Sequence, residues 1–396
     1  MKNVLTIVLI SVTLATWGQS DTLSQKQQQK IDKKAERTAK KAQKLEEGKL
    51  LLSPLILPGY TPELQFAIGG GGLLSWKNNK SDKNLPRSNM AVGLSFSSTG
   101  AIVLNFRPIT YWASDNFRLN GDIWYKDMPD HYWGIGYQKG YETPKTDSTT
   151  AYQRLWYQFR GDALFRLKGN LFGGLTFDIN YTKGSDASEG VINDPNYFQY
   201  NDKPLNIGIG PIIRYDSRDV PVNACKGFYL NAQALFYGSY LGGDNTYQMI
   251  LLDYRQYKNI SNQKGRTLAW QIATRMTFGD VPYSEMSQLG TPFDLRGYTW
   301  GRYRDKCMFF WIAEYRHMFS KADGTLSKSG FVAWIGAGTI YDIEKADTGN
   351  NAETNKWLPN LGVGYRLELQ PRLNMRIDFG IGRETTGFYF NMNEAF

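Results

Sequence analysis

The sequence predicts an all-β protein, a sixteen-stranded antiparallel transmembrane β-barrel that follows a short periplasmic helix. Three observations lead to this prediction. Aromatic residues make up 14% of the 396 residues and there are 40 glycines, a combination that favours strands and tight turns. The N-terminus is that of an exported protein, yet no later segment has the run of about 18 apolar residues that a membrane-spanning helix needs. Most of the remaining chain alternates apolar and polar residues with a period of two.

Residues 1–18 are predicted to be a secretory signal peptide that is cleaved from the mature protein. The start is basic, and the apolar run that follows it is too short to cross a bilayer. Thr16 and Gly18 provide the small residues of a cleavage site, with Thr13 and Ala15 as the alternative pair. Export combined with a barrel pattern predicts the outer membrane of a Gram-negative cell.

Residues 19–60 are predicted to form a basic periplasmic helix and a proline-rich linker. The segment 21–50 carries nine lysines and arginines against five acidic residues, and the whole chain has a net charge of +9. The apolar residues of this helix recur at helical spacing but form only a thin stripe. Two interpretations stay open, namely a helix solvated on all sides and a helix that contacts an acidic partner or lipid phosphates.

The segment 61–396 is predicted to be the barrel. Within it, Leu175 and Ile179 alternate with Thr176 and Asp178, so one face of the strand is apolar and the other is polar. The apolar faces persist for about ten residues, the length of a strand that crosses a bilayer. Sixteen segments show such signals, an even number, as a closed barrel with both termini on one side requires. The predicted strands are 62–76, 88–97, 101–113, 116–126, 131–139, 151–167, 170–183, 204–217, 227–240, 245–258, 266–279, 307–319, 330–342, 358–369, 372–384 and 386–396.

A soluble β-sandwich is the alternative fold, since its strands also alternate apolar and polar residues. The polar faces of the predicted strands, however, repeatedly carry arginine and aspartate among glycines. An outer face toward lipid and an inner face toward a polar lumen explain this arrangement. The residues expected to place charge in the lumen include Arg107, Arg118, Asp122, Arg154, Arg160, Asp162, Asp178, Arg214 and Arg275.

Several short segments carry a resemblance to a known family. The most specific is LRGY, which lies between the eleventh and twelfth predicted strands, in the sixth outer loop. The segments are PGYTPELQFAIGGGG at 58–72, YDSRD at 215–219 followed by GFY at 227–229, LRGY at 295–298 and GFYFNMNEAF at 387–396. Together they resemble the barrel domain of the BamA/TamA outer-membrane assembly family, the bacterial surface-antigen barrels.

The resemblance implies that the sixth loop folds back into the lumen of the barrel. The motif consists of Leu295, Arg296, Gly297 and Tyr298. In the family, the motif arginine contacts acidic residues on the inner wall of the twelfth and thirteenth strands, and Glu314 matches the acid of the twelfth strand. The resemblance therefore implies a charge-assisted pair between Arg296 and Glu314.

Two features depart from the family pattern. Gly336 stands where the thirteenth strand would carry its acid, so Arg296 is expected to keep only half of the usual acidic clasp. BamA and TamA also carry periplasmic POTRA modules before the barrel, and residues 19–60 are too short for one, so we expect a relative that lacks POTRA modules. Arg316 lies two residues after Glu314, on the same face of the strand, and is expected to face the lumen as well.

The resemblance assigns two further groups of residues. The strand-turn signature comprises Asp216, Arg218, Asp219 and Gly227. The lateral seam, where the first strand meets the last, comprises Gly69, Gly70, Gly71, Gly72 and Phe396. In the family this seam is the gate through which substrates reach the membrane. The glycines are expected either to weaken the first strand at this gate or simply to relieve crowding in a curved wall.

The sequence contains no motif that indicates an enzyme, a metal site or a cofactor. His131 and His317 lack metal-ligand spacing, and Cys225 and Cys307 are predicted to be free thiols about a barrel height apart. The body of the chain is only mildly basic and its aromatic residues are expected to face lipid, which excludes nucleic acid as a partner. No small-molecule substrate is evident. The expected partners are outer-membrane lipid and either protein clients or subunits of an envelope complex.

Three functions stay open at this point. The family resemblance implies assistance with the insertion or translocation of proteins, or of lipid, at the outer membrane. A plugged passive pore is the second candidate, because the mixed charges predicted for the lumen fit a salt-bridged interior. A structural subunit of an envelope complex, docked through the basic helix, is the third.

Overall fold

The computed structural model divides into two compact units, 1–51 and 52–396, and describes the second almost completely. The described residues are 29, 32, 36, 40, 43, 44 and 47–396, apart from 84, 261–264, 347–355 and 371. The predicted signal peptide lies outside these residues. The six described residues between 29 and 44 are all helical, as predicted for the basic segment. One turn of this helix is supported by an ion pair between Glu36 and Lys40 at 2.6 Å.

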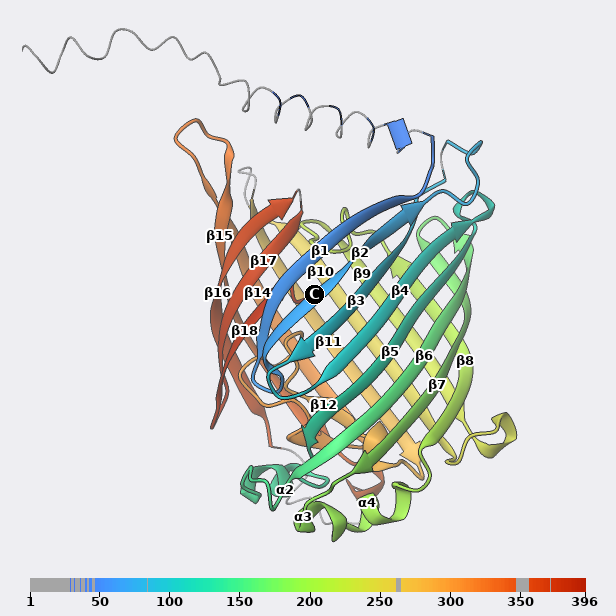
Figure 1. The fold of residues 1–396 in the computed structure, drawn as a ribbon, viewed down its shortest axis with the longest axis vertical. Helices are drawn as coiled ribbons and strands as arrows, with labels where there is room; N and C mark the ends of the chain where they lie inside the picture. The colour runs from blue at the N-terminus through green and yellow to red at the C-terminus, as the bar shows by residue number, and fades with distance from the viewer. Residues whose placement is uncertain are drawn as a thin grey trace, which may run out of the picture. The chain divides into compact units, whose positions relative to one another are not determined.

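Sixteen antiparallel strands form a closed barrel, which confirms the predicted fold class (Figure 1). The wall strands, in chain order, are β1 (Leu51–Thr61), β2 (Gln65–Trp76), β3 (Ser88–Ser97), β4 (Ile102–Trp112), β5 (Phe117–His131), β6 (Ala151–Lys168), β7 (Leu171–Ser185), β8 (Leu205–Asp216), β9 (Gly227–Tyr237), β10 (Tyr247–Asn259), β11 (Arg266–Gly279), β14 (Cys307–Ser320), β15 (Leu326–Tyr341), β16 (Leu358–Gln370), β17 (Leu373–Ile381) and β18 (Thr386–Met392). Each strand pairs with the next along the chain, and β18 closes the barrel on β1. The connection between β11 and β14 holds a separate two-stranded sheet of β12 (Ser287–Leu289) and β13 (Tyr303–Asp305).

Short helices occupy the loops between the strands. They are α2 (Tyr137–Glu142), α3 (Glu189–Ile192), α4 (Pro195–Tyr200), α5 (Ile343–Ala346) and the 3-10 turns η1 (Ala113–Asp115), η2 (Ser239–Leu241) and η3 (Tyr283–Glu285). Helices α2, α3 and α4 gather at the end of the barrel drawn at the bottom of Figure 1. The start of α4 is favoured by Asp194, whose carboxylate accepts hydrogen bonds from the N–H groups of Asn196 and Tyr197. Among the described residues, no helix is long and apolar enough to cross a membrane.

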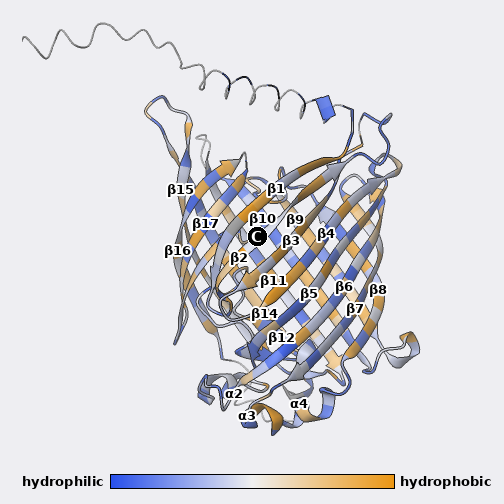
Figure 2. Cartoon of the chain, viewed as in Figure 1, coloured by the Kyte–Doolittle hydropathy of each residue, from blue (hydrophilic) through white to orange (hydrophobic). Residues whose placement is uncertain are grey.

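The strands turn their apolar side chains outward and their polar side chains inward. On β7, Leu175 is 54% exposed on the outside, whereas Thr176 and Asp178 are fully buried inside. Figure 2 shows the result as alternating hydrophobic and hydrophilic bands along the wall. This arrangement is the reverse of a soluble domain and is the one expected of a barrel that stands in lipid.

Most of the charged residues predicted to face the lumen form ion pairs there. Each pair joins neighbouring positions on the inner wall or on a turn, so the lumen carries both signs of charge. The pairs are Arg107–Asp122, Arg118–Asp115, Arg154–Asp130, Arg160–Asp178, Arg214–Asp162 and Arg275–Glu285. A lumen lined in this way has its buried charges compensated locally.

The barrel begins at Leu51, about ten residues before the predicted boundary, and this corrects the assignment of 51–60 to a linker. Two prolines led to that assignment, because proline cannot donate a hydrogen bond to a strand ladder. The segment is nevertheless the first wall strand, since Tyr60 lies opposite Phe390 of β18 and Ile56 is exposed on the outside. The predicted strand 131–139 is also wrong, because the chain leaves β5 at His131 and reaches α2 through two glycines with positive φ.

The four glycines of the predicted seam lie one strand away from it. Gly69, Gly70, Gly71 and Gly72 belong to β2 and face Ser95 to Val92 of β3, whereas the barrel closes between β1 and β18. A Cβ atom on Gly71 would lie 2.0 Å from the carbonyl oxygen of Val92, and one on Gly72 would lie 2.8 Å from that of Ser53. Crowding between adjacent strands therefore explains Gly71 and Gly72, in line with the interpretation that these glycines relieve crowding in a curved wall.

The inverted wall leads to a first prediction about stability. Val363 lies on the outer face near the middle of β16 and is 59% exposed. Val363→Arg is expected to lower the free energy of unfolding by about 2–4 kcal/mol, because it places a charge in lipid. Arg107→Ala is the control. It removes the half-exposed ion pair with Asp122, which contributes less than about 1 kcal/mol to the free energy of unfolding. Denaturant unfolding from lipid vesicles measures both, and equal losses would contradict the assignment of the outer face.

Candidate functional site

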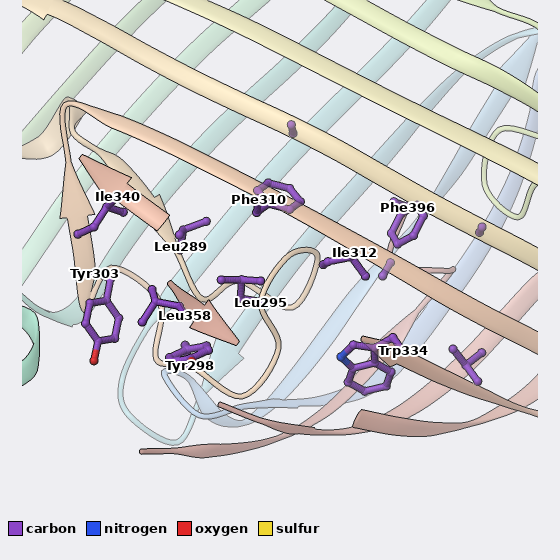
Figure 3. Close-up of a cluster of buried hydrophobic side chains, with 14 of the residues drawn as sticks. Leu289, Leu295, Tyr298, Tyr303, Phe310, Ile312, Trp334, Ile340, Leu358 and Phe396 are labelled. Carbon is purple, nitrogen blue, oxygen red and sulfur yellow. The ribbon is translucent and has the colours of Figure 1, made fainter. Parts of the chain in front are cut away.

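The connection between β11 and β14, residues 280–306, lies inside the barrel, and we call it the lumen loop. Its small sheet of β12 and β13 and the turn η3 give it a defined path. Leu295 and Tyr298 are fully buried and pack in one cluster with Ile312 and Trp334 of the wall. Figure 3 shows Ile312 of β14 and Trp334 of β15 beside Leu295 and Tyr298 of the loop. The expected return of the sixth loop into the lumen is thus present in the structure.

Arg296, the motif arginine, is fully buried and has two acidic partners. One guanidinium nitrogen contacts the Glu314 carboxylate, and the other donates to Asp378 Oδ2 at 2.9 Å. The guanidinium also lies on the face of Trp334, 3.6 Å from the ring centroid. Because charged hydrogen bonds strengthen where water is excluded, two carboxylates and an aromatic face can compensate the burial of this charge.

Asp378 on β17 supplies the second acid, so the expectation of a half clasp is wrong. A side chain at Gly336 has no room, because a Cβ atom there would lie 2.5 Å from the carbonyl oxygen of Trp311. Asp378 comes from two strands further along the wall and is fully buried. The period-two pattern of β17 already placed Asp378 on the inner face, and this pattern was the sequence signal that could have identified it as a partner of Arg296.

The two carboxylates of this site are shared with further arginines. Glu314 also accepts from Arg316 Nε at 2.9 Å, so both residues face the lumen as predicted. Asp378 accepts from Arg366 Nη1 at 2.6 Å and from Arg376 Nη1 at 2.7 Å. Arg296 is therefore one member of a buried network that links β14, β16 and β17.

Gly297 and Tyr298 have separate reasons for their place in the motif. Gly297 has a φ of 115°, and a Cβ atom there would lie 2.8 Å from the backbone of Gly380. Its N–H donates to the Tyr389 hydroxyl of β18 at 2.9 Å. Tyr298 donates its hydroxyl hydrogen to the carbonyl oxygen of Pro359 at 2.7 Å. Close backbone approach and two tyrosine hydrogen bonds thus hold the loop against the last three wall strands.

The far side of the lumen loop is tied to other parts of the barrel. The N–H of Trp300 donates to Glu63 Oε1, in the turn between β1 and β2, at 3.0 Å. Burial raises the pKa of Glu63, and the hydrogen bond from Trp300 opposes that effect. Arg302 Nε donates to the carbonyl oxygen of Gly140 in α2 at 2.8 Å, and the Trp300 ring lies 5.2 Å from the ammonium group of Lys126 on β5. The loop therefore reaches both sides of the lumen.

The strand-turn signature forms the turn between β8 and β9, and Asp219 of this turn also pairs with Arg372. Arg218 donates to both carboxylate oxygens of Asp216, at 2.9 and 2.8 Å. Asp219 accepts from the N–H of Cys225, and Gly227 has a φ of 97° that favours glycine. Burial opposes a lowered pKa of Asp219, but these backbone hydrogen bonds and the nearby Arg372 lower it. The signature therefore shapes the turn between these two strands.

Phe396, which was predicted to end the closing strand, points into the lumen. Strand β18 ends at Met392, and Asn393 has a left-handed backbone with φ 66° that turns the chain inward. The residues that follow, Glu394 to Phe396, are buried inside. Glu394 is thus a lumen residue. We call residues 393–396 the tail segment.

The described residues hold no group of three His, Cys, Asp or Glu side chains that could bind a metal ion. Cys225 lies in the turn between β8 and β9, and Cys307 begins β14. Both are free thiols, as predicted. The contacts shown by the site are ion pairs and hydrogen bonds that hold the lumen loop.

A family model described as the Omp85 superfamily domain matches residues 75–396. The chain belongs to the Omp85 superfamily. This result confirms the resemblance found in the motifs and identifies the chain as an outer-membrane barrel. A comparison with curated protein sequences found no match.

Solved structures share the fold of this Omp85 barrel. BamA from Haemophilus ducreyi, lacking POTRA domains 1–3, is 13% identical with a TM-score of 0.59, and the match covers 91% of this chain and 78% of that one. CdiB from Acinetobacter baumannii is 10% identical with a TM-score of 0.54, covering 87% of this chain and 60% of that one. CdiB from Escherichia coli is 11% identical with a TM-score of 0.54, covering 85% of this chain and 61% of that one. At these identities the likeness shows the fold alone.

Arg296 is predicted to anchor the lumen loop of this Omp85 barrel. Arg296→Ala is expected to weaken the anchoring by about 1–3 kcal/mol, because Glu314 and Asp378 each lose one donor but keep another arginine. The rate at which proteinase K cuts within 280–306 in folded barrels measures the effect. Arg107→Ala, a lumen arginine away from the loop, is the matched control. A cutting rate equal to that of the unchanged barrel would mean that Arg296 does not hold the loop.

The two acids are predicted to differ in importance. Asp378→Asn is expected to lower the free energy of unfolding by on the order of 3–5 kcal/mol. Glu314→Gln is expected to lower it less, because Asp378 pairs with three arginines and Glu314 with two. Unfolding in denaturant and proteolysis of the lumen loop measure both variants. If Glu314→Gln were the more damaging change, Asp378 would not be the principal partner of the cluster.

Proposed function

We propose that this barrel assists the insertion or translocation of proteins at the outer membrane. Membership of the Omp85 superfamily supports this proposal, and so does the fold shared with BamA and CdiB. The observation that carries it is a lumen loop tied by Arg296 to the wall near the closing strand and by Glu63 to the turn after the first strand. A loop held at both flanks of the closure is suited to a barrel whose lumen and seam act together.

The filled lumen argues against a continuously open pore as the function. The lumen loop and the tail segment both lie inside the barrel, where Arg296 of the loop and Glu394 of the tail pair with charged residues of the wall. An open diffusion channel would require the lumen loop and the tail segment to move out of the lumen. The proposal therefore favours a barrel that changes state when it handles a client over one that conducts continuously.

The closing pair is the proposed route by which a client reaches the membrane. Tyr60 of β1 lies opposite Phe390 of β18, and the Tyr60 ring contacts Phe66 and Phe388 on the outer face. We also propose that residues 1–18 direct export and are removed, and that protein clients are the partners. Depletion of the protein in cells, followed by a survey of outer-membrane proteins and lipids, would distinguish protein clients from lipid.

A covalent lock across the closing pair tests the route. Residues opposite each other on antiparallel strands lie about 4.5–5.5 Å apart at Cα, within the range of a disulfide. Tyr60→Cys with Phe390→Cys, in a background that carries Cys225→Ser and Cys307→Ala, is expected to abolish complementation of a deletion strain when oxidised. Reduction of the disulfide is expected to restore it, because the fold itself is unchanged.

The control places the same disulfide elsewhere in the wall. Ile179 of β7 lies opposite Ile207 of β8, far from the closure along the strand order. A disulfide between cysteines at these two positions is expected to leave complementation intact. Full complementation by the locked closing pair would exclude opening of this seam as the mechanism and would favour a scaffold role.

A further inference from the structure

The tail segment makes two separate sets of contacts inside the lumen. Glu394 accepts from Arg366 Nε at 2.8 Å and from Asn374 Nδ2 at 2.7 Å. The main-chain oxygen of Phe396 accepts from Arg316 Nη2 at 3.0 Å. These contacts recognise an acidic side chain and, two residues later, the backbone of an aromatic residue.

The Phe396 ring occupies a place of its own within the site. It lies 5.0 Å from the guanidinium of Arg316 and 6.3 Å from the ring of Tyr257 on β10. Figure 3 shows the ring near Ile312, with which it shares one buried cluster. The same arginine thus contacts both the ring and the backbone of Phe396, which makes this position selective for an aromatic residue.

The groups that hold the tail segment are fixed by the wall itself. Arg316 also pairs with Glu314, and Arg366 also pairs with Asp378, so each guanidinium keeps a carboxylate partner when the tail leaves. Asn374 pairs with Glu368 of β16 beside a register shift, and Tyr257 pairs with Ala269 of β11. The site is therefore a preformed receptor, and the tail segment is its occupant.

The charges of the wall favour an acidic occupant. Among the directly bonded side chains, the guanidinium groups of Arg296, Arg316, Arg366 and Arg376 outnumber the carboxylates of Glu314 and Asp378. Glu394 offsets part of this excess. Two buried nitrogens at the site, Arg316 Nη1 and Arg366 Nη2, have no hydrogen-bond partner among the described residues. Donors in excess of acceptors are what a site for an anionic peptide segment requires.

We propose that the lumen contains a peptide-binding site, formed by Tyr257, Arg316, Arg366 and Asn374, for a segment in which an acidic residue precedes an aromatic residue by two positions. The tail segment fills this site at rest. A second polypeptide with the same spacing displaces it and takes over its contacts.

Occupancy of this site is transmitted to the motif arginine. Arg316 shares Glu314 with Arg296, and Arg366 shares Asp378 with Arg296. When the site is empty, Arg316 and Arg366 lose acceptors and compete with Arg296 for the two carboxylates. Displacement of the tail segment by a peptide therefore keeps the lumen loop anchored, whereas a vacant site loosens it.

The first experiment measures binding of a fluorescein-labelled hexapeptide, Asn-Met-Asn-Glu-Ala-Phe, to the full chain in detergent. The variant Glu394→Gln with Phe396→Ala is expected to bind this peptide saturably, because its own tail no longer competes. A control peptide, Asn-Met-Asn-Gln-Ala-Ala, is expected to bind about tenfold more weakly or worse, since it lacks one charged hydrogen bond and the ring. Equal binding of the two peptides, or none, would overturn the proposal.

A second measurement applies if that variant does not fold. Ala395→Cys, in the background with Cys225→Ser and Cys307→Ala, places one thiol on a buried residue of an otherwise intact tail. A water-soluble maleimide is expected to label it slowly, and excess hexapeptide is expected to raise the labelling rate several-fold. The control peptide is expected to have no effect. A rate that the hexapeptide leaves unchanged would show that the tail is a fixed part of the barrel and would refute the exchange.

Discussion

The buried guanidinium of Arg296 is the constraint on which the lumen of this barrel depends. A charge removed from water is tolerated only where paired groups replace the lost hydration. Glu314, Asp378 and the face of Trp334 do so, and the two carboxylates are shared in turn with further arginines of the wall. The clasp is therefore one network and cannot be divided into independent pairs, because each carboxylate serves more than one cation.

The position of this network explains how a loop can be coupled to the closure of the barrel. On one side, the N–H of Gly297 donates to Tyr389 on the last strand. On the other side, the N–H of Trp300 donates to Glu63 beside the first strand. Any separation of β1 from β18 would change the distance between these two anchors, so the loop cannot remain bonded to both while the seam opens widely.

Backbone contact is the second means by which the wall holds the loop. A Cβ atom on Gly380 would lie 2.2 Å from the carbonyl oxygen of Arg296, and one on Gly382 would lie 2.7 Å from the Tyr298 ring. A glycine near the end of β17 and one just beyond it thus let the motif come within contact distance of the wall. Asp378, two residues earlier on the same face, reaches Arg296 because this approach is so close.

The sequence by itself determined the properties that depend on local periodicity. Alternation of apolar and polar residues predicted a barrel with a charged interior, and the motif identified Arg296 and Glu314 as partners. The sequence analysis missed strand β1, because the prolines of 51–61 argue against a strand that pairing with β18 stabilises. It also predicted a strand at 131–139, where glycines turn the chain.

Only the tertiary structure decided which inward residues meet. Asp378 replaces the acid missing at position 336 because the lumen loop crosses to β17, and no period within a strand reports that crossing. Phe396 enters the lumen because Asn393 adopts a left-handed conformation at the end of the ladder. Side-chain direction along a strand is a local property that the sequence encodes, whereas contacts across a closed barrel depend on its curvature and register, which involve all sixteen strands at once.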